Sequence, residues 1–166
     1  MTATGSPSAT ENSYPLHVVL YQPEIPPNTG NIGRTCVALG AKLWIVRPTG
    51  FRLDSAQIKR SGMDYWDDLA LELADSWEQL EDKLPSRNIW LLTKFGDKPH
   101  CGVTYQYGDI LVFGRESSGL PEALHQQYSD RQIVIPMPGP VRCLNLATAA
   151  GIVMYEAARQ IGLFNP

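Results

Sequence analysis

The sequence predicts an α/β fold with a mainly parallel sheet and helices on both faces. Five short runs are nearly continuous in apolar residues, a pattern typical of strands buried on both faces; they cover residues 16–21, 42–46, 88–92, 109–113 and 132–135. Helical patterns alternate with them at 28–39, 76–84, 121–127 and 145–161. This alternation indicates a parallel α/β domain. Ligands of such sheets bind beyond the carboxyl ends of the strands, so the loops there are the candidates for a functional site.

The expected helix ends have recognisable signals. Asn28 can cap the first helix, and Gly40 can end it in a left-handed conformation. Ser76 and Gln79 fit a capping box for the second helix. Gly162 is the expected stop of the last helix.

Length and composition fit one soluble domain. The 166 residues are 43% hydrophobic and 19% charged, ordinary values for a globular protein. Residues 1–14 are rich in Ser, Thr, Ala and Gly without an apolar core, so we expect a disordered tail rather than a signal peptide, followed by a single domain at 15–166. No run is long enough to span a membrane. Cys36, Cys101 and Cys143 form no CxxC pair, which favours a cytoplasmic protein without a zinc site or a disulfide framework.

The net charge of −3 conceals an uneven distribution of charge. Residues 64–82 contain eight acidic residues and no Lys or Arg; outside this stretch, nine acidic residues face 14 basic ones. We therefore expect one acidic face on a mildly basic remainder, which permits RNA binding without demonstrating it.

Three segments after predicted strands are candidates for chemistry; we call them the first, second and third motif segments. The first, PEIPPNTGNIGR at 23–34, contains glycines that let the backbone approach a ligand or a neighbouring strand, and its helix start offers free amides to a phosphate or carboxylate. Arg34 could clamp a phosphate or a ribose. A capped helix with a surface arginine explains this segment equally well.

The second and third motif segments also follow strands. FGRESSGLP at 113–121 holds Glu116 between two glycines in a tight turn, where it brings a carboxylate close to backbone amides. IPMPGPVRCLNL at 135–146 is a stiff, irregular path whose unpaired backbone groups can bind an adenine edge. Taken alone, Glu116 is an exposed acid in a turn and Asn145 a helix cap.

In this order and spacing, NTGNIGR, FGRESSGLP and IPMPGPVRCLNLATA resemble the three motifs of the SPOUT RNA methyltransferases. The opening LYQPEIPPNTGNIGRTC is most similar to the bacterial tRNA wobble-nucleotide ribose 2′-O-methyltransferases. The resemblance runs from about Leu16 to Gly162. It implies a trefoil knot near the C-terminus and S-adenosylmethionine bound inside the knot.

The resemblance also implies roles for individual residues. Arg34 would act on the target ribose, with Glu116 and Asn145 holding the substrate and the motif geometry. The predicted cofactor-binding residues are Leu92, Thr93, Gly114, Ile135, Met137, Cys143 and Leu144. The predicted RNA-binding residues are Asn28, Asn31, Arg34, Arg142 and Tyr155, although a core position is the favoured interpretation of Tyr155. Many relatives have Ser in place of Cys143, and often Ser in place of Ala147. If the hydroxyl of that Ser positions the RNA in the relatives, this protein must position the RNA in another way.

The resemblance implies S-adenosylmethionine-dependent 2′-O-methylation of a tRNA, with the wobble cytidine or carboxymethylaminomethyluridine of tRNA-Leu as the expected target. The expected partners are the anticodon stem-loop and a second copy in a homodimer, with no metal and no membrane. An arginine is a poor base because its pKa exceeds about 12. We therefore favour a role for Arg34 in orienting the hydroxyl and stabilising the developing negative charge, with an RNA phosphate as one candidate for the proton acceptor. A basic run able to meet phosphates consists of Arg47, Arg52, Lys59 and Arg60.

Three other functions remain open. A base methyltransferase of the same fold would place the methyl group on a base rather than on a ribose. A non-catalytic member would bind tRNA and transfer nothing. A nucleotide-dependent oxidoreductase would use a similar sheet, but the first strand is not followed by GxGxxG.

Overall fold

A seven-stranded sheet forms the centre of the protein. The structure, a computed structural model, describes residues 13–54 and 64–165. In these residues every pair of adjacent strands in the sheet is parallel, in the order β3-β2-β1-β6-β4-β7-β5. The strands are β1 (Leu16–Tyr21), β2 (Lys42–Val46), β3 (Leu71–Ala74), β4 (Ile89–Leu92), β5 (Lys98–Pro99), β6 (Asp109–Phe113) and β7 (Gln132–Val134). The predicted parallel α/β fold is confirmed.

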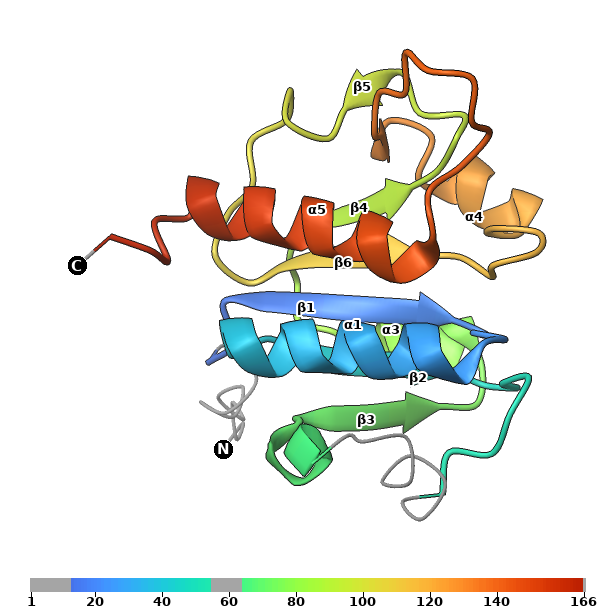
Figure 1. Ribbon diagram of the computed structural model, residues 1–166, viewed down its shortest axis with the longest axis vertical. Helices are drawn as coiled ribbons and strands as arrows, with labels where there is room; N and C mark the ends of the chain where they lie inside the picture. The colour runs from blue at the N-terminus through green and yellow to red at the C-terminus, as the bar shows by residue number, and fades with distance from the viewer. Residues whose placement is uncertain (1–12, 55–63, 166) are drawn as a thin grey trace, which may run out of the picture.

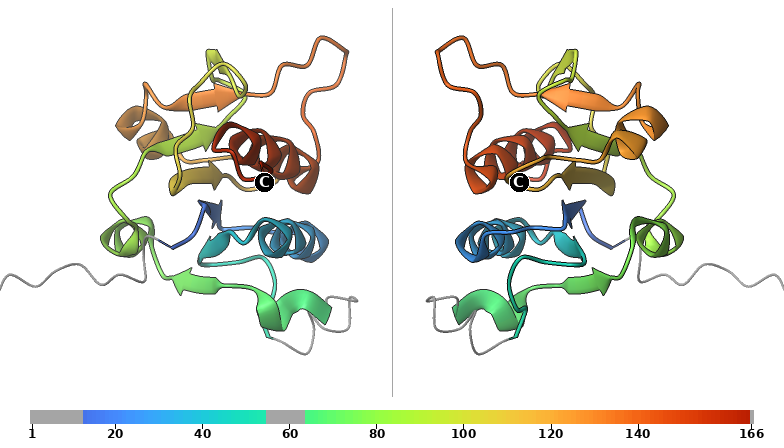
Figure 2. Two further views of the ribbon diagram at one scale, coloured as in Figure 1. Left: turned by 90° about the vertical axis from the view of Figure 1, so that its left-hand side faces the viewer. Right: turned by 90° about the vertical axis from the view of Figure 1, so that its right-hand side faces the viewer.

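Helices cover both faces of the sheet, as predicted. On one face α1 (Pro26–Leu39) and α5 (Leu146–Gln160) lie side by side (Figure 1). On the other face are α3 (Trp77–Lys83) and α4 (Glu122–Gln127), which the edge-on views separate clearly from the first pair (Figure 2). The short 3-10 helix η1 (Asp64–Asp68) packs against α1.

Two apolar cores result from this layering. Between the sheet and the α1–α5 layer, Leu20, Ile32 and Met154 are fully buried. Between the sheet and the α3–α4 layer, Trp44 and Leu80 are buried. The central strands supply side chains to both cores, which explains why their sequences are continuously apolar instead of alternating.

The first helix begins earlier than predicted. Its N-cap is Ile25, and Pro26 and Pro27 occupy its first two positions. Proline suits these positions because its φ is preset and it has no N–H group to leave unpaired. Asn28 is therefore a buried residue of the first turn, and the prediction that it caps the helix is wrong. Gly40 ends the helix with φ 67°, as predicted.

The other predicted helix ends are largely confirmed. The Ser76 side chain accepts a hydrogen bond from the Gln79 amide at 3.2 Å. The Gln79 side chain bonds the amide of Asp75 at 2.6 Å, not that of Ser76, so the capping box is shifted by one residue on that side. Asn145 caps α5, and Gly162 follows that helix with φ 76°.

Two strands, β3 and β5, were not predicted from the sequence. β3 lies inside the acidic stretch, where Glu72 bonds Lys42 at 2.8 Å and Lys83 at 3.4 Å. Seven of the eight acidic residues at 64–82 lie on η1, β3 and α3, and Asp75 lies between β3 and α3; β3 forms the edge strand of the sheet there. β5 is a two-residue strand containing a proline, which gives no sequence signal.

Several expectations remain predictions. Residues 1–12 of the expected tail lie outside the described residues, as do Lys59 and Arg60. The division into tail and single domain and the trefoil knot are likewise still predictions. Within the described residues, no helix is long and apolar enough to cross a membrane.

Candidate active site

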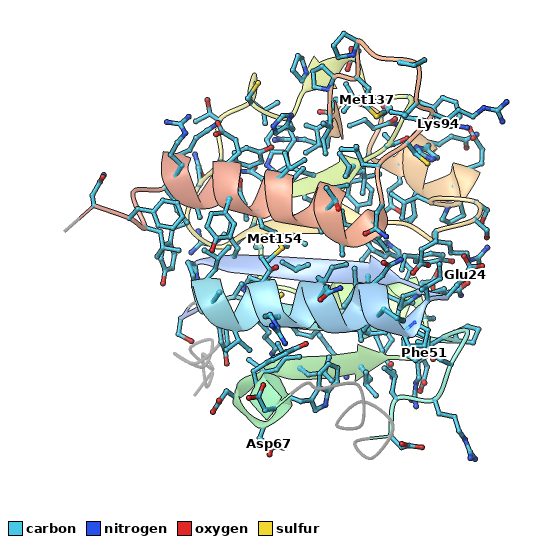
Figure 3. The ribbon with its side chains drawn as sticks, viewed as in Figure 1. Glu24, Phe51, Asp67, Lys94, Met137 and Met154 are labelled. Atoms are coloured by element: carbon cyan, nitrogen blue, oxygen red, sulfur yellow. The ribbon has the colours of Figure 1, made fainter. Side chains whose placement is uncertain are left out.

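A cavity of about 850 Å³ opens at the carboxyl ends of the strands. β1, β3 and β4 point towards the same side of the molecule (Figure 1). The loops after β4, β6 and β7 line the cavity, and Ile25 and Asn28 complete it. Figure 3 shows the lining residues Lys94 and Met137 in the upper right of the view, with Glu24 below them. This is the position in which parallel α/β sheets bind their ligands.

The structure brings most of the predicted site residues to this cavity. All seven predicted cofactor-binding residues line it: Leu92, Thr93, Gly114, Ile135, Met137, Cys143 and Leu144. Asn28, Glu116, Arg142 and Asn145 line it too. These residues are far apart in the sequence, so the cavity is assembled by the fold.

Gly114 is required by the turn that closes the second motif segment. Arg115 and Gly119 pair through their backbones, with the Arg115 amide donating at 3.1 Å and the Gly119 amide at 2.9 Å. A Cβ atom on Gly114 would lie 2.4 Å from the carbonyl carbon of Gly119 and 2.5 Å from the nitrogen of Leu120. No side chain fits that space, because the clash is with backbone atoms. Gly119 itself has φ 69°, which favours glycine.

The carboxylate of Glu116 satisfies the backbone at the start of the first motif segment. It accepts hydrogen bonds from the amides of Glu24 at 2.8 Å and Ile25 at 3.1 Å, and from the Asn28 side chain at 3.3 Å. The next two residues are prolines without N–H groups. The expectation of free amides for an external anion at this helix start is therefore wrong, since the protein supplies its own carboxylate.

Glu24 makes the reciprocal contact. Its carboxylate accepts hydrogen bonds from the Ser117 amide at 2.9 Å and the Ser117 hydroxyl at 2.8 Å. These bonds hold the pKa of the Glu24 carboxyl below its usual value. Each of the two motif segments thus offers a carboxylate to the backbone of the other, which fixes their relative position.

Asn28 links the first motif segment to the third. Its Oδ1 atom accepts a hydrogen bond from the Asn145 side chain at 2.9 Å. The Oδ1 atom of Asn145 in turn accepts from the amides of Ala147 at 2.9 Å and Thr148 at 3.3 Å, capping α5. Glu116, Asn28 and Asn145 therefore form one hydrogen-bonded chain across all three motif segments. Their predicted contacts with substrate or RNA remain predictions.

The cavity mouth is positively charged. Lys94, Arg115 and Arg142 line it, and Lys94 and Arg142 are exposed. The one acid of the lining, Glu116, is engaged by the hydrogen bonds described above. Such a surface favours a ligand that carries phosphate or carboxylate groups.

Three of the predicted RNA-binding residues lie outside the cavity lining. Arg34 and Asn31 are exposed on α1, and the guanidinium of Arg34 lies 5.0 Å from the centre of the Tyr65 ring. Tyr155 is 48% exposed and stacks on Phe164 with ring centres 5.6 Å apart. The favoured interpretation of Tyr155 as a core residue is wrong.

Sequence reasoning missed Glu24 and Ser117, and also Arg115, whose guanidinium bonds the Gln22 side chain. These contacts connect residues more than 90 positions apart. The one signal in the sequence was the position of Glu24 among Pro23, Pro26 and Pro27.

Of the basic run expected from the sequence, Arg47 is paired with Asp75, while Arg52 is exposed.

A parallel sheet with a cavity at the carboxyl ends of its strands is typical of α/β proteins that bind a nucleotide-like cofactor there. The chain belongs to the SpoU rRNA Methylase family, whose model matches residues 15–155. The resemblance found in the three motif segments is thereby confirmed.

Relatives and solved structures are similar over most of the chain. A tRNA (cytidine(34)-2′-O)-methyltransferase of Escherichia coli (strain K12) is 43% identical over 149 residues, which covers 89% of this chain and 94% of the relative. A structure described as "Structural insights into the 2-OH methylation of C/U34 on tRNA" has a TM-score of 0.83 at 46% identity, covering 89% of this chain and 96% of its own. The structure of an AdoMet-bound rRNA methyltransferase from Sinorhizobium meliloti has a TM-score of 0.78 at 26% identity. The match covers 92% of this chain and 60% of that methyltransferase.

Proposed function

We propose that this protein transfers the methyl group of S-adenosylmethionine to the 2′ oxygen of the ribose at tRNA position 34. The target nucleotide is the wobble cytidine or modified uridine in the anticodon loop of a tRNA-Leu. The observation that carries the proposal is the cavity at the carboxyl ends of the strands, bounded by three mutually bonded motif segments. The activity named for the similar protein of Escherichia coli supports the same reaction.

The cavity suits S-adenosylmethionine in size and chemistry. Its volume of about 850 Å³ lies within the roughly 300–1,000 Å³ of small-molecule sites. Leu92, Ile135, Met137 and Leu144 give it apolar walls. The irregular backbone of residues 135–145 offers polar groups to the adenine edge. When bound, the cofactor supplies a sulfonium-activated methyl group, so the protein mainly has to align that group with the 2′ oxygen.

Arg34 has the reactive role in this proposal. Its planar fork of donors orients the ribose hydroxyl and stabilises the negative charge that develops on the oxygen. The hydroxyl proton passes to an RNA phosphate, because a guanidinium is already protonated at neutral pH. Glu116 and Asn145 hold the motif segments in place by the bonds that they make here.

The RNA meets the positive cavity mouth, where Lys94, Arg115 and Arg142 lie. Bases of an anticodon loop are unstacked and accessible, which suits recognition by a small protein. We further propose that the protein acts in the cytoplasm as a homodimer formed through the outer face of α5. Exposed apolar side chains on and after α5 support this surface: Ile152, Tyr155, Leu163 and Phe164. Sedimentation should give twice the mass of the chain.

The test is transfer of a labelled methyl group from S-adenosylmethionine to purified tRNA, followed by digestion to nucleosides. We expect the label in a 2′-O-methylated nucleoside. A matched tRNA with 2′-deoxyribose at position 34 should accept no label, because it lacks the hydroxyl. Label on a base would favour the base methyltransferase, and tRNA binding without transfer would favour the non-catalytic protein.

A further inference from the structure

Gly30 and Gly33 of the first motif segment leave part of the α1 surface without side chains. Gly30 precedes Gly33 by three residues and Arg34 by four, so both lie on the side of the helix that carries Gly30. A Cβ atom on Gly33 would lie 3.2 Å from Leu69 Cδ2 and 3.4 Å from the Trp66 ring. The absent side chains thus let η1 and the residues after it approach α1 closely. Among these three residues, Arg34 alone has a side chain that reaches beyond this packed surface.

Tyr65 of η1 contacts that arginine directly. The Arg34 guanidinium lies 5.0 Å from the centre of the Tyr65 ring, within the range of a cation–π interaction. The Tyr65 hydroxyl donates a hydrogen bond to the carbonyl oxygen of Gly30. Gly30 is one turn before Arg34 on the same helix. This bond and the packing of η1 against α1 place the ring beside the helix that carries the arginine.

We propose that Tyr65 is a positioning residue for Arg34, holding its guanidinium in the orientation in which it meets the target ribose. This inference rests on the proposed function, in which Arg34 orients the 2′ hydroxyl. Arg34 is exposed, and an exposed arginine loses much rotamer freedom when it engages a ligand. Contact with an aromatic ring restrains the side chain beforehand and leaves most of its five N–H donors available to the RNA.

The test measures single-turnover methyl transfer to tRNA at saturating S-adenosylmethionine. Tyr65→Leu should lower the rate about tenfold, whereas Tyr65→Phe, which keeps the ring, should stay within about threefold of wild type. Cofactor affinity measured by calorimetry should not change, because Tyr65 does not line the cavity. Trp66→Leu is the matched control, because Trp66 follows Tyr65 on η1 and its ring also lies near Gly33. It should lower the melting temperature and leave the transfer rate near wild type.

A double-mutant cycle separates positioning from a purely structural role. In an Arg34→Ala background, Tyr65→Leu should cause no further loss, because the side chain that it positions is gone. An equal loss in both backgrounds would overturn the inference, and so would a wild-type rate for Tyr65→Leu or a tenfold loss in Trp66→Leu. If Tyr65→Leu does not fold, Tyr65→Met retains more of the volume and takes its place in the cycle.

The two proposals fail in different ways. If the wild-type protein transfers no methyl group to a tRNA ribose, the proposed function is wrong. If the wild type is active and the cycle shows independent effects, the function stands and the role of Tyr65 is wrong.

Discussion

Glu24 and Glu116 show how single side chains define the site. Each carboxylate accepts two hydrogen bonds of 3.1 Å or less from the opposite motif segment. The donors to Glu116 are two backbone amides, and the donors to Glu24 are the amide and the hydroxyl of Ser117. Such charge-assisted bonds are stronger than neutral ones. They also provide partners for amides at a helix start that would otherwise lack acceptors. Glu116 in the cavity lining and Glu24 beside it therefore hold the shape of the site.

Replacing Arg34 should separate chemistry from cofactor binding. Arg34→Ala should bind S-adenosylmethionine with wild-type affinity, since the residue lies outside the cavity lining. Methyl transfer in a single turnover should fall by about a hundredfold or more, equivalent to about 2.7 kcal/mol of transition-state stabilisation. Arg34→Lys should recover little, because a point charge does not reproduce the planar fork. Wild-type turnover by Arg34→Ala would show that it is merely a surface arginine.

His17 should make the stability of the protein depend on pH. Its side chain is buried and accepts a hydrogen bond from the Trp44 ring nitrogen at 3.0 Å. Burial, and then the nearby charges of Lys42 and Arg87, lower the pKa of His17 from 6.5 to about 4. The unfolded chain therefore binds a proton that the folded protein does not, between those two pH values. The free energy of unfolding should be unaffected by His17 above pH 6.5 and fall as the pH drops towards 4, by up to about 1.4 kcal/mol per pH unit.

Chemical denaturation of the wild type and of His17→Gln across this pH range measures the effect. The glutamine oxygen can still accept from Trp44 but does not titrate, so the variant should lose the part of the slope that His17 causes. Parallel curves for the two proteins would show that His17 titrates alike in both states.

At the scale of elements, Asn145 connects the start of α5 with the first motif segment. Asn145→Asp should preserve the acceptor for the amides of Ala147 and Thr148, and its charge suits a helix start. The substitution removes the side-chain NH2 group that donates to Asn28 Oδ1, so a carboxylate oxygen at position 145 would face the Asn28 oxygen. We expect stability within about 1 kcal/mol of wild type but cofactor affinity and methyl transfer reduced about tenfold.

Asn145→Ala is the companion variant. It loses both the cap and the bond to Asn28, and the lost cap should cost about a further 1 kcal/mol of unfolding free energy. Calorimetry with S-adenosylmethionine and thermal melts of both variants provide the comparison. Wild-type affinity and turnover in Asn145→Asp would mean that the bond between the motif segments does not matter for function.

The elements that the sequence predicted correctly are those with one dominant signal. β1, β2 and β6 have the predicted bounds because their runs are apolar throughout. β3 was hidden because an edge strand needs little apolar sequence, and its acid Glu72 is paired with lysines from β2 and α3. The start of α1 was misplaced because Asn28 has the composition of a cap, whereas the two prolines before it already fit the helix.

The candidate site was predictable in position but not in its internal bonding. Glycine and proline after apolar strands indicated the three motif segments, and the residues expected there line one cavity. The pairing of Glu24 with Ser117 was not predictable, because no local pattern links residues 93 positions apart. The position of Arg34 beside Tyr65 depends in the same way on how η1 packs against α1.

Across the whole molecule, charge is separated by position. The acidic stretch runs from η1 and the edge strand β3 to α3, whereas the basic residues of the cavity mouth follow β4, β6 and β7. An overall charge of −3 therefore does not prevent RNA from approaching the mouth. The distribution also favours one direction of approach, towards the carboxyl ends of the strands.

The most direct test of the central claim is mass spectrometry of tRNA from cells that lack this protein. Digested tRNA-Leu species from the parent strain should contain a 2′-O-methyl group on nucleotide 34, and those from the deletion strain should lack it. Expression of the wild-type protein should restore the group, and expression of Arg34→Ala should not. An unchanged nucleotide 34 in the deletion strain, or loss of a methyl group from a base instead of a ribose, would contradict the account.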